Sequence, residues 1–229
     1  MLMPLGCATQ RFTVPVMPPL ISPPKAAVFW TESFDALDPE RWREVEVRRH
    51  TQYQAVDVEG RRCLQAKSDD GASILLTSLR FNPRTYTWLS WDWRVDQLVE
   101  GEALERKEGS DAPARVYVYF ETRGLSWQKR SLDYVWSASL PVGAVLDSAF
   151  SPTSKIIVAE SGAASLGQWR TVERNLANDY ERAFGEDSPD VIAIGVMSDT
   201  DNTNAHAMAY VDELRVSRLP RASRGPVGP

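Results

Sequence analysis

Along most of the chain, apolar and polar residues alternate over short runs that are separated by turn-forming residues. Alternation with a period of two indicates β-strands, because successive side chains of a strand point to opposite faces of its sheet. Many short strands with little helix predict a sandwich or a barrel. We expect strands near residues 28–34, 52–58, 62–67, 73–79, 86–96, 114–121, 131–139, 155–160, 169–174, 191–198 and 207–217.

The alternation also divides each strand into a core face and an outward face. In the run 86–96, YTWLSWDWRVD, Trp91 and Trp93 lie on the apolar face, which we expect in the core. In the run 131–139, SLDYVWSAS, both faces carry apolar residues. The direction of Trp136 therefore stays open.

The run 114–121, ARVYVYFE, has an outward face that suits ligand binding. Tyrosine rings stack on the apolar face of a sugar, and charged groups bond to its hydroxyls. The alternative is a solvated sheet face with cross-strand Arg and Asp pairs. If the runs 86–96, 114–121 and 131–139 are neighbours, their polar faces form one patch of Asp92, Arg94, Arg115, Tyr117, Tyr119 and Asp133.

One segment, ERNLANDYERAFGED, departs from the period of two. Asn175 suits an N-cap, Leu176 and Tyr180 fall on one helical face, and Gly185 suits a helix end. We expect one short helix near residues 176–184 that covers an open end or edge of the sandwich. The charged run 99–111 predicts a mobile loop instead.

The two ends of the chain differ from its middle. We expect residues 1–27 to form a signal remnant and a Pro-rich tether, residues 28–217 one folded domain, and residues 218–229 a disordered basic tail. In MLMPLGCATQ, Gly6 and Cys7 resemble the end of a bacterial lipoprotein signal, so we expect lipidation of Cys7. The alternative is an ordinary disordered N-terminus with a chance cysteine.

That interpretation places the protein in the cell envelope, as a periplasm-facing lipoprotein or a secreted protein. No stretch approaches the roughly 20 apolar residues of a membrane span, so we expect membrane attachment only through the lipid anchor. A formal net charge of -5 argues against nucleic acid as a partner. If Cys7 carries lipid, Cys63 has no intramolecular partner and is a small buried hydrophobe. The sequence leaves the oligomeric state undefined.

The segment SDTDNTN crowds oxygen-bearing side chains between two apolar runs. Asp199, Asp201 and Thr203 alternate like the start of a calcium loop, but Asn204 stands where an EF-hand has glycine. The alternative is a hairpin turn whose amides bond to Asp199 and Asn202. Both interpretations stay open, and no cofactor is certain.

Several blocks of the chain occur in an order that resembles an uncharacterised bacterial family: LSWDWRVD, DAPARVYVYFE, DYVWS, GQWRTVERNLANDYERAFGE and IGVMSDTDNTNAHAMAYVDELRV. The family is a domain of unknown function that occurs largely in secreted and envelope proteins. The resemblance implies a jelly-roll sandwich similar to carbohydrate-binding modules, without an established activity. The family's recurring polar positions fall on Asp111, Arg115, Trp136, Asp179, Asp199, Asp201, Asn202 and Thr203.

The opening block ESFDALDPERW is also similar to the first strand and turn of jelly-roll glucanases and lectin-like modules. In those proteins the first and last strands often share a structural calcium. This similarity implies Glu32 and Asp212 as the matching metal ligands.

Common catalytic signatures are missing from the sequence, which has two histidines and none of the motifs of zinc proteases, serine hydrolases or P-loop NTPases. We therefore expect a non-catalytic domain that binds a polysaccharide or another envelope ligand. One alternative is a glycoside hydrolase or polysaccharide lyase with paired carboxylates, for which Asp111, Asp199 and Asp201 are candidates. Another is a structural or assembly factor of the envelope.

Overall fold

A computed structural model describes residues 27–122 and 129–221, which fold into two β-sheets packed face to face, with one helix. Sheet A contains β1 (Val28–Glu32), β3 (Gln52–Val58), β4 (Arg61–Asp69), β6 (Trp88–Val95), β11 (Arg170–Asn175) and β13 (His206–Ser217). Sheet B contains β2 (Arg43–Arg48), β5 (Ala72–Phe81), β7 (Ala112–Phe120), β8 (Arg130–Ser137), β9 (Val145–Asp147), β10 (Ser154–Ser161) and β12 (Val191–Asp199).

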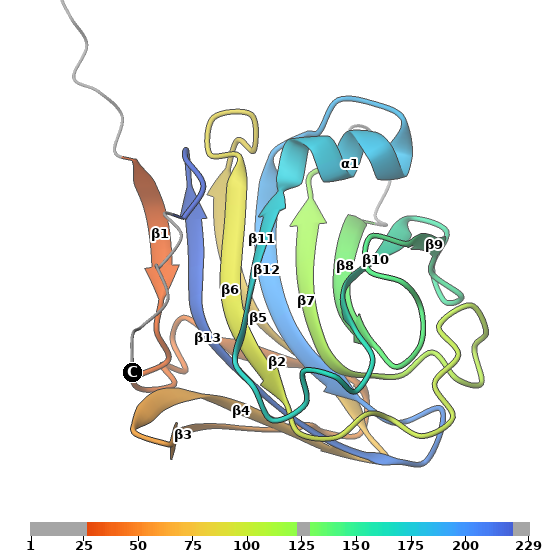
Figure 1. Ribbon diagram of the computed structural model, residues 1–229. Helices are drawn as coiled ribbons and strands as arrows, with labels where there is room; N and C mark the ends of the chain where they lie inside the picture. Colours follow the sequence, from red (N-terminus) through yellow and green to blue (C-terminus); the bar gives the residue numbers. More distant parts are fainter. Residues whose placement is uncertain (1–26, 123–128, 222–229) are drawn as a thin grey trace, which may run out of the picture.

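The strand orders show how segments that are distant in sequence become neighbours. Sheet A runs β11-β6-β13-β4-β3, with β1 also paired to β13, and sheet B runs β2-β5-β12-β7-β8-β10-β9. Among these neighbours, β8 and β10 are parallel and the other pairs are antiparallel. The two layers are visible in Figure 1. The predicted jelly-roll β-sandwich is confirmed.

Aromatic side chains fill the space between the sheets. Trp91 and Trp93 of β6 are fully buried and contact each other edge to face at 5.4 Å, as the alternation predicted. Tyr134 and Trp136 of β8 come from the opposite sheet and contact this pair at 5.4 and 5.8 Å. Since large aromatic rings bury much apolar surface, this cluster joins the two layers.

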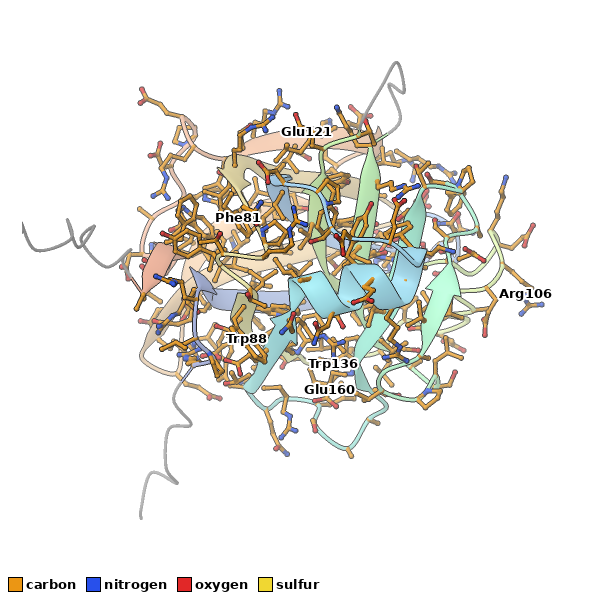
Figure 2. The ribbon with its side chains drawn as sticks, turned by 90° about the horizontal axis from the view of Figure 1, so that it is seen from above. Phe81, Trp88, Arg106, Glu121, Trp136 and Glu160 are labelled. Atoms are coloured by element: carbon orange, nitrogen blue, oxygen red, sulfur yellow. The ribbon has the colours of Figure 1, made fainter. Side chains whose placement is uncertain are left out.

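The helix α1 (Leu176–Phe184) begins and ends where the sequence predicted. The Asn175 side chain accepts a hydrogen bond from the Asn178 amide at 3.0 Å, and Gly185 takes the left-handed conformation that glycine tolerates. The Tyr180 ring packs 4.6 Å from the Phe120 ring of β7. In Figure 2 the labelled Glu121 and Trp88, from different sheets, lie on opposite sides of α1, so the helix covers this end of the sandwich.

Two strands were not predicted, and the charged loop differs from its expectation. β2 is exposed along its whole length and β9 has three residues, so neither carries a burial pattern. In the run 99–111, Leu104 is fully buried and Glu102 accepts a hydrogen bond from the Ala138 amide at 2.8 Å. These contacts hold the loop against sheet B rather than leaving it mobile.

The predicted lipidation site at Cys7 and the Pro-rich tether up to residue 26 lie outside the described residues, as does the tail beyond Arg221. The described start of that tail returns to sheet A, where Arg221 Nη1 lies 3.0 Å from Asp92 Oδ1. Within the described residues, no helix is long and apolar enough to cross a membrane.

Candidate functional site

The structure gathers most of the predicted ligand residues at one end of sheet B. Asp199 ends β12 and aligns with Ala112 at the start of β7, so the loops beyond these two positions meet. The residues brought together there are Asp111, Arg115, Asp199, Asp201, Asn202 and Thr203. Whether they form a site or a structural contact depends on their hydrogen bonds.

Asp111 holds the loop after β12 in place. Its carboxylate is fully buried and accepts hydrogen bonds from the Thr203 amide and the Thr203 hydroxyl, both at 2.7 Å. It also accepts from the Asn202 amide at 3.1 Å and the Asn202 side-chain amide at 2.7 Å. The turn amides are thus satisfied, but by an aspartate 91 residues away along the chain rather than by Asp199 or Asn202.

Arg115 is the centre of a second buried group of contacts. It is only 2% exposed, and its guanidinium donates to Asp133 at 2.5 Å, to Asp199 at 2.8 Å and to the Ser110 carbonyl at 2.8 Å. Although burial opposes its charge, Asp133 and Asp199 raise the pKa of Arg115 well above its ordinary value. Because the guanidinium is enclosed by the protein's own acceptors, Arg115 does not contact a surface ligand.

Trp136 and Asp179 do not join this group. Trp136 is fully buried between the sheets, and its indole N–H donates to the Gly162 carbonyl at 3.2 Å. Asp179 lies on α1, where it accepts hydrogen bonds from Arg174 and from the Tyr134 hydroxyl. Their prediction as ligand-binding residues needs correction, because both side chains are enclosed by the fold.

A metal at this end of sheet B would use the carboxylates of Asp111, Asp199 and Asp201, whose nearest oxygens lie within 4.8 Å of one another. Both oxygens of Asp111 already accept hydrogen bonds, and Oδ1 of Asp199 accepts from Arg115 and the Ala112 amide. A cation would compete with these donors and with the guanidinium charge. The contacts therefore favour a locked turn over a calcium loop.

The other predicted metal ligands, Glu32 and Asp212, each have partners of their own. Glu32 accepts a hydrogen bond from the Trp42 indole at 2.9 Å and pairs with Arg41, while Asp212 pairs with Arg61 at 2.5 Å. These contacts give no support to a calcium shared between β1 and β13.

The buried carboxylates at this end of sheet B exceed the buried positive charge. Asp133 and Asp199 share the guanidinium of Arg115, and the buried Asp111 lies close to Asp199. Burial raises the pKa of Asp199 to about 7, against the opposing effect of Arg115. An aspartate with a raised folded pKa takes up a proton on folding, so its contribution to stability is present below about pH 4 and lost as the pH rises to about 7.

We expect the stability advantage of wild type over Asp199→Asn to fall by about 1–2 kcal/mol between pH 5 and pH 7, because only the wild type releases a proton from this position. Urea unfolding at both pH values measures this difference, and the variant corrects for the other titrating groups. A difference that is constant, or that grows with pH, would show that Asp199 is charged throughout this range.

Tyr117 and Tyr119 are predicted ligand residues that remain partly exposed, as do Asp201, Asn202 and Thr203 in the loop after β12. The two tyrosines lie on the outer face of β7, with their rings 5.7 Å apart and inclined by only 12°. Burial raises the pKa values of both hydroxyls, and Asp133 adds to this effect. Both hydroxyls are therefore neutral over the physiological pH range, and the Tyr117 hydroxyl makes a hydrogen bond to the Asp133 carboxylate.

Small and aliphatic residues flank the two rings on the side of β12. Gly195 aligns with Tyr117 and Ala193 with Tyr119, and β12 lies beside β7 in sheet B (Figure 1). A Cβ atom on Gly195 would lie 2.7 Å from Cγ2 of Ile74, so Ile74 of β5 packs directly over the glycine. Partly exposed Leu76 continues this apolar surface.

On the other side of the rings, β8 supplies polar groups. Asp133 aligns with Tyr117 and Ser131 with Tyr119, and both of these side chains are almost fully buried. The outer face of sheet B thus combines two aromatic rings, an apolar strip and a polar edge. We call this surface, formed by Ile74, Leu76, Tyr117, Tyr119, Ser131, Asp133, Ala193 and Gly195, the tyrosine face.

The wider patch predicted across three strands is wrong in one part. β7 and β8 are neighbours, but β6 belongs to the other sheet, so Asp92 and Arg94 lie on the opposite side of the sandwich. Sequence reasoning did not place Ile74 and Gly195 on this surface, because their runs are apolar on both faces. The only signal was a glycine inside a strand, which often marks the close approach of another part of the chain.

A search of curated protein sequences finds no match. Among solved structures, the family 11 carbohydrate-binding module of the cellulosomal cellulase Lic26A-Cel5E of Clostridium thermocellum is 12% identical, with a TM-score of 0.46, 87% of this chain covered and 100% of the module. The family 30 module of cellulase Cel9D-Cel44B from the same organism is 11% identical, with a TM-score of 0.41 and coverages of 87% and 94%.

A model of a protein family of unknown function, DUF3047, matches residues 40–215. The matched region begins before β2 and ends within β13, so it contains nearly all of both sheets and the whole of α1. It also contains the Asp111 and Arg115 contacts and the tyrosine face. The resemblance found in the sequence is confirmed, and the chain belongs to the DUF3047 family.

Proposed function

We propose that this domain binds a glycan on the tyrosine face without turning it over. The observation that carries the proposal is the partly exposed Tyr117 and Tyr119 pair on the outer face of a strand in the middle of sheet B. Rings at this position offer a surface for the apolar face of a sugar. Leu104 and its neighbours cover the outer face of β8 and β10, so a polymer would extend from the pair over β12 and β5.

The surroundings of the two rings suit a neutral polymer better than a charged one. The tyrosine hydroxyls are neutral, and the charge of Asp133 is compensated by Arg115 at 2.5 Å. Beyond β12, the partly exposed Ile74 and Leu76 add an apolar strip to the same face. Sugar C–H groups can contact the rings and the strip, while the sugar hydroxyls face the Tyr119 hydroxyl and the solvent.

The positions of the carboxylates support binding rather than hydrolysis. A glycosidase needs two carboxyl groups about 5–10 Å apart that face the same substrate bond. Asp111 and Asp199 are almost fully buried and accept hydrogen bonds from the protein itself. Two clefts of the described residues are lined by other side chains. The candidate catalytic pair therefore lies outside both of these clefts.

Affinity electrophoresis in gels that contain a soluble β-glucan, a galactomannan or alginate tests this proposal. We expect retardation by a neutral polysaccharide, and a roughly tenfold weaker affinity in Tyr117→Ala and in Tyr119→Ala because the stacking surface is lost. Tyr117→Phe keeps the ring and should retain most of the affinity.

Trp169→Ala is the matched control, because Trp169 is a partly exposed aromatic residue that contacts Arg61 and Tyr210 on sheet A. Its affinity should equal that of wild type. No retardation in any gel, or equal weakening in Trp169→Ala and Tyr117→Ala, would overturn the assignment to the tyrosine face.

A further inference from the structure

A separate cleft of about 530 Å³ lies at the end of the sandwich that α1 covers. Its walls come from the end of β7, the start of β8, the helix, and the segment between α1 and β12. The labelled Glu121 in Figure 2 belongs to this lining. The volume is within the range of small-molecule sites, about 300–1,000 Å³.

Ser188 gives this cleft an unusual feature. It lines the cleft, is only 3% exposed, and its hydroxyl has no hydrogen-bond partner within the described part of the chain. A buried hydroxyl without a partner destabilises a fold, so native structures rarely contain one. A ligand in the cleft that bonds to Ser188 would remove this penalty.

The charged groups of the cleft all have partners, and one of them, Glu121, pairs with Arg80 outside the cleft. Arg130 pairs with Glu186 and donates to the Tyr180 hydroxyl at 2.9 Å, and Arg84 lies 3.3 Å from Asp187. Because cations and carboxylates are both present, a strongly anionic or cationic ligand meets a like charge on one wall. A neutral ligand with many hydroxyls can instead donate to the carboxylates and accept from the guanidinium groups.

We propose that this cleft is a second binding site, for a neutral polyhydroxylated ligand of the size of a sugar ring. Ser188 bonds to a ligand hydroxyl, and Arg130 and Glu186 supply the paired donor and acceptor. The cleft does not include any residue of the tyrosine face. The proposal is therefore independent of binding at that face.

NMR titration of the ¹⁵N-labelled protein with the methyl glycosides of glucose, galactose and mannose tests the second site, with inorganic phosphate and free arginine as charged probes. We expect saturable shifts at the amides of Arg130, Glu186 and Ser188 for at least one glycoside. Ser188→Ala should raise its Kd roughly tenfold. The melting temperature should stay equal or rise, because an unpartnered hydroxyl has been removed.

Ser90→Ala is the matched control, since Ser90 is 2% exposed and its hydroxyl also has no partner in the described residues, but it does not line the cleft. Its Kd should equal that of wild type. No saturable glycoside shift, saturation by phosphate or arginine only, or normal binding by Ser188→Ala would each overturn the proposal. If Ser188→Ala fails to fold, Arg130→Gln, which removes the proposed donor in the cleft, should also raise the Kd.

Because the sites are distinct, Tyr117→Ala should leave the cleft shifts unchanged. Loss of polysaccharide retardation in Tyr117→Ala with intact cleft shifts would support both proposals. Intact retardation with no cleft shifts would overturn only the second site.

Discussion

Replacement of Arg115 by methionine is expected to lower the free energy of unfolding by about 3–5 kcal/mol, because it leaves Asp133 and Asp199 buried without their cation. Methionine keeps much of the side-chain volume, so the loss reports mainly on charge and hydrogen bonds. Urea unfolding at pH 7, followed by tryptophan fluorescence, measures the change. Arg115 does not contact the glycan in this account, so glycan affinity at the tyrosine face should fall only if the replacement also disturbs the folded structure.

Arg94→Met is the control for this prediction. Arg94 also pairs with two carboxylates, Asp96 at 2.7 Å and Glu59 at 3.0 Å, but those partners are partly or largely exposed. Ion pairs of this kind contribute about 0–1 kcal/mol. Equal losses in Arg94→Met and Arg115→Met would contradict the role of burial at Arg115.

Replacement of Asp111 by alanine is expected to cost about 3 kcal/mol, since several charge-assisted hydrogen bonds to the loop after β12 are lost and two turn amides lose their acceptor. Asp201→Ala is the control in the same loop. The Asp201 side chain accepts a hydrogen bond only from its neighbour Asn202 among the described contacts, so its loss should be below about 0.5 kcal/mol.

The effect of calcium on the melting temperature distinguishes a turn held by hydrogen bonds from a metal-binding loop. The locked turn predicts that calcium leaves the melting temperature of wild type unchanged. A calcium-dependent rise that disappears in Asp201→Ala would instead show that the acidic residues of this loop bind the metal.

Some features followed from the sequence because they depend on near neighbours. The core face of β6 is set by alternation alone, and the ends of α1 are set by Asn175 and Gly185. These local preferences agree with the tertiary structure, so the sandwich and its helix were predictable. Trp136 was not, because its run is apolar on both faces and only sheet packing decides its direction.

Whether the loop after β12 is a structural turn or a ligand site could not be predicted, because the answer depends on the strand order of sheet B. Asp111 reaches Asn202 and Thr203 only because β12 lies between β5 and β7 in sheet B. No local pattern reveals that pairing. Six of the eight residues that the family resemblance marked therefore form a cluster, but most of them bond to the protein itself.

Only part of the tyrosine face was predictable from the sequence. The outward positions of Tyr117 and Tyr119 followed from alternation, whereas the apolar strip beside them required the register of three strands. Asp92 and Arg94 were expected in this patch and lie on sheet A instead.

The most direct test of the central claim is a ¹⁵N NMR titration with an oligosaccharide of the polysaccharide that retards the protein most strongly. The account predicts that the largest shifts fall on Tyr117, Tyr119 and Gly195, with little change in the amides of residues 200–204. Shifts concentrated in residues 200–204, with Tyr117 and Tyr119 unaffected, would show that the loop after β12 is the binding site and would contradict the account.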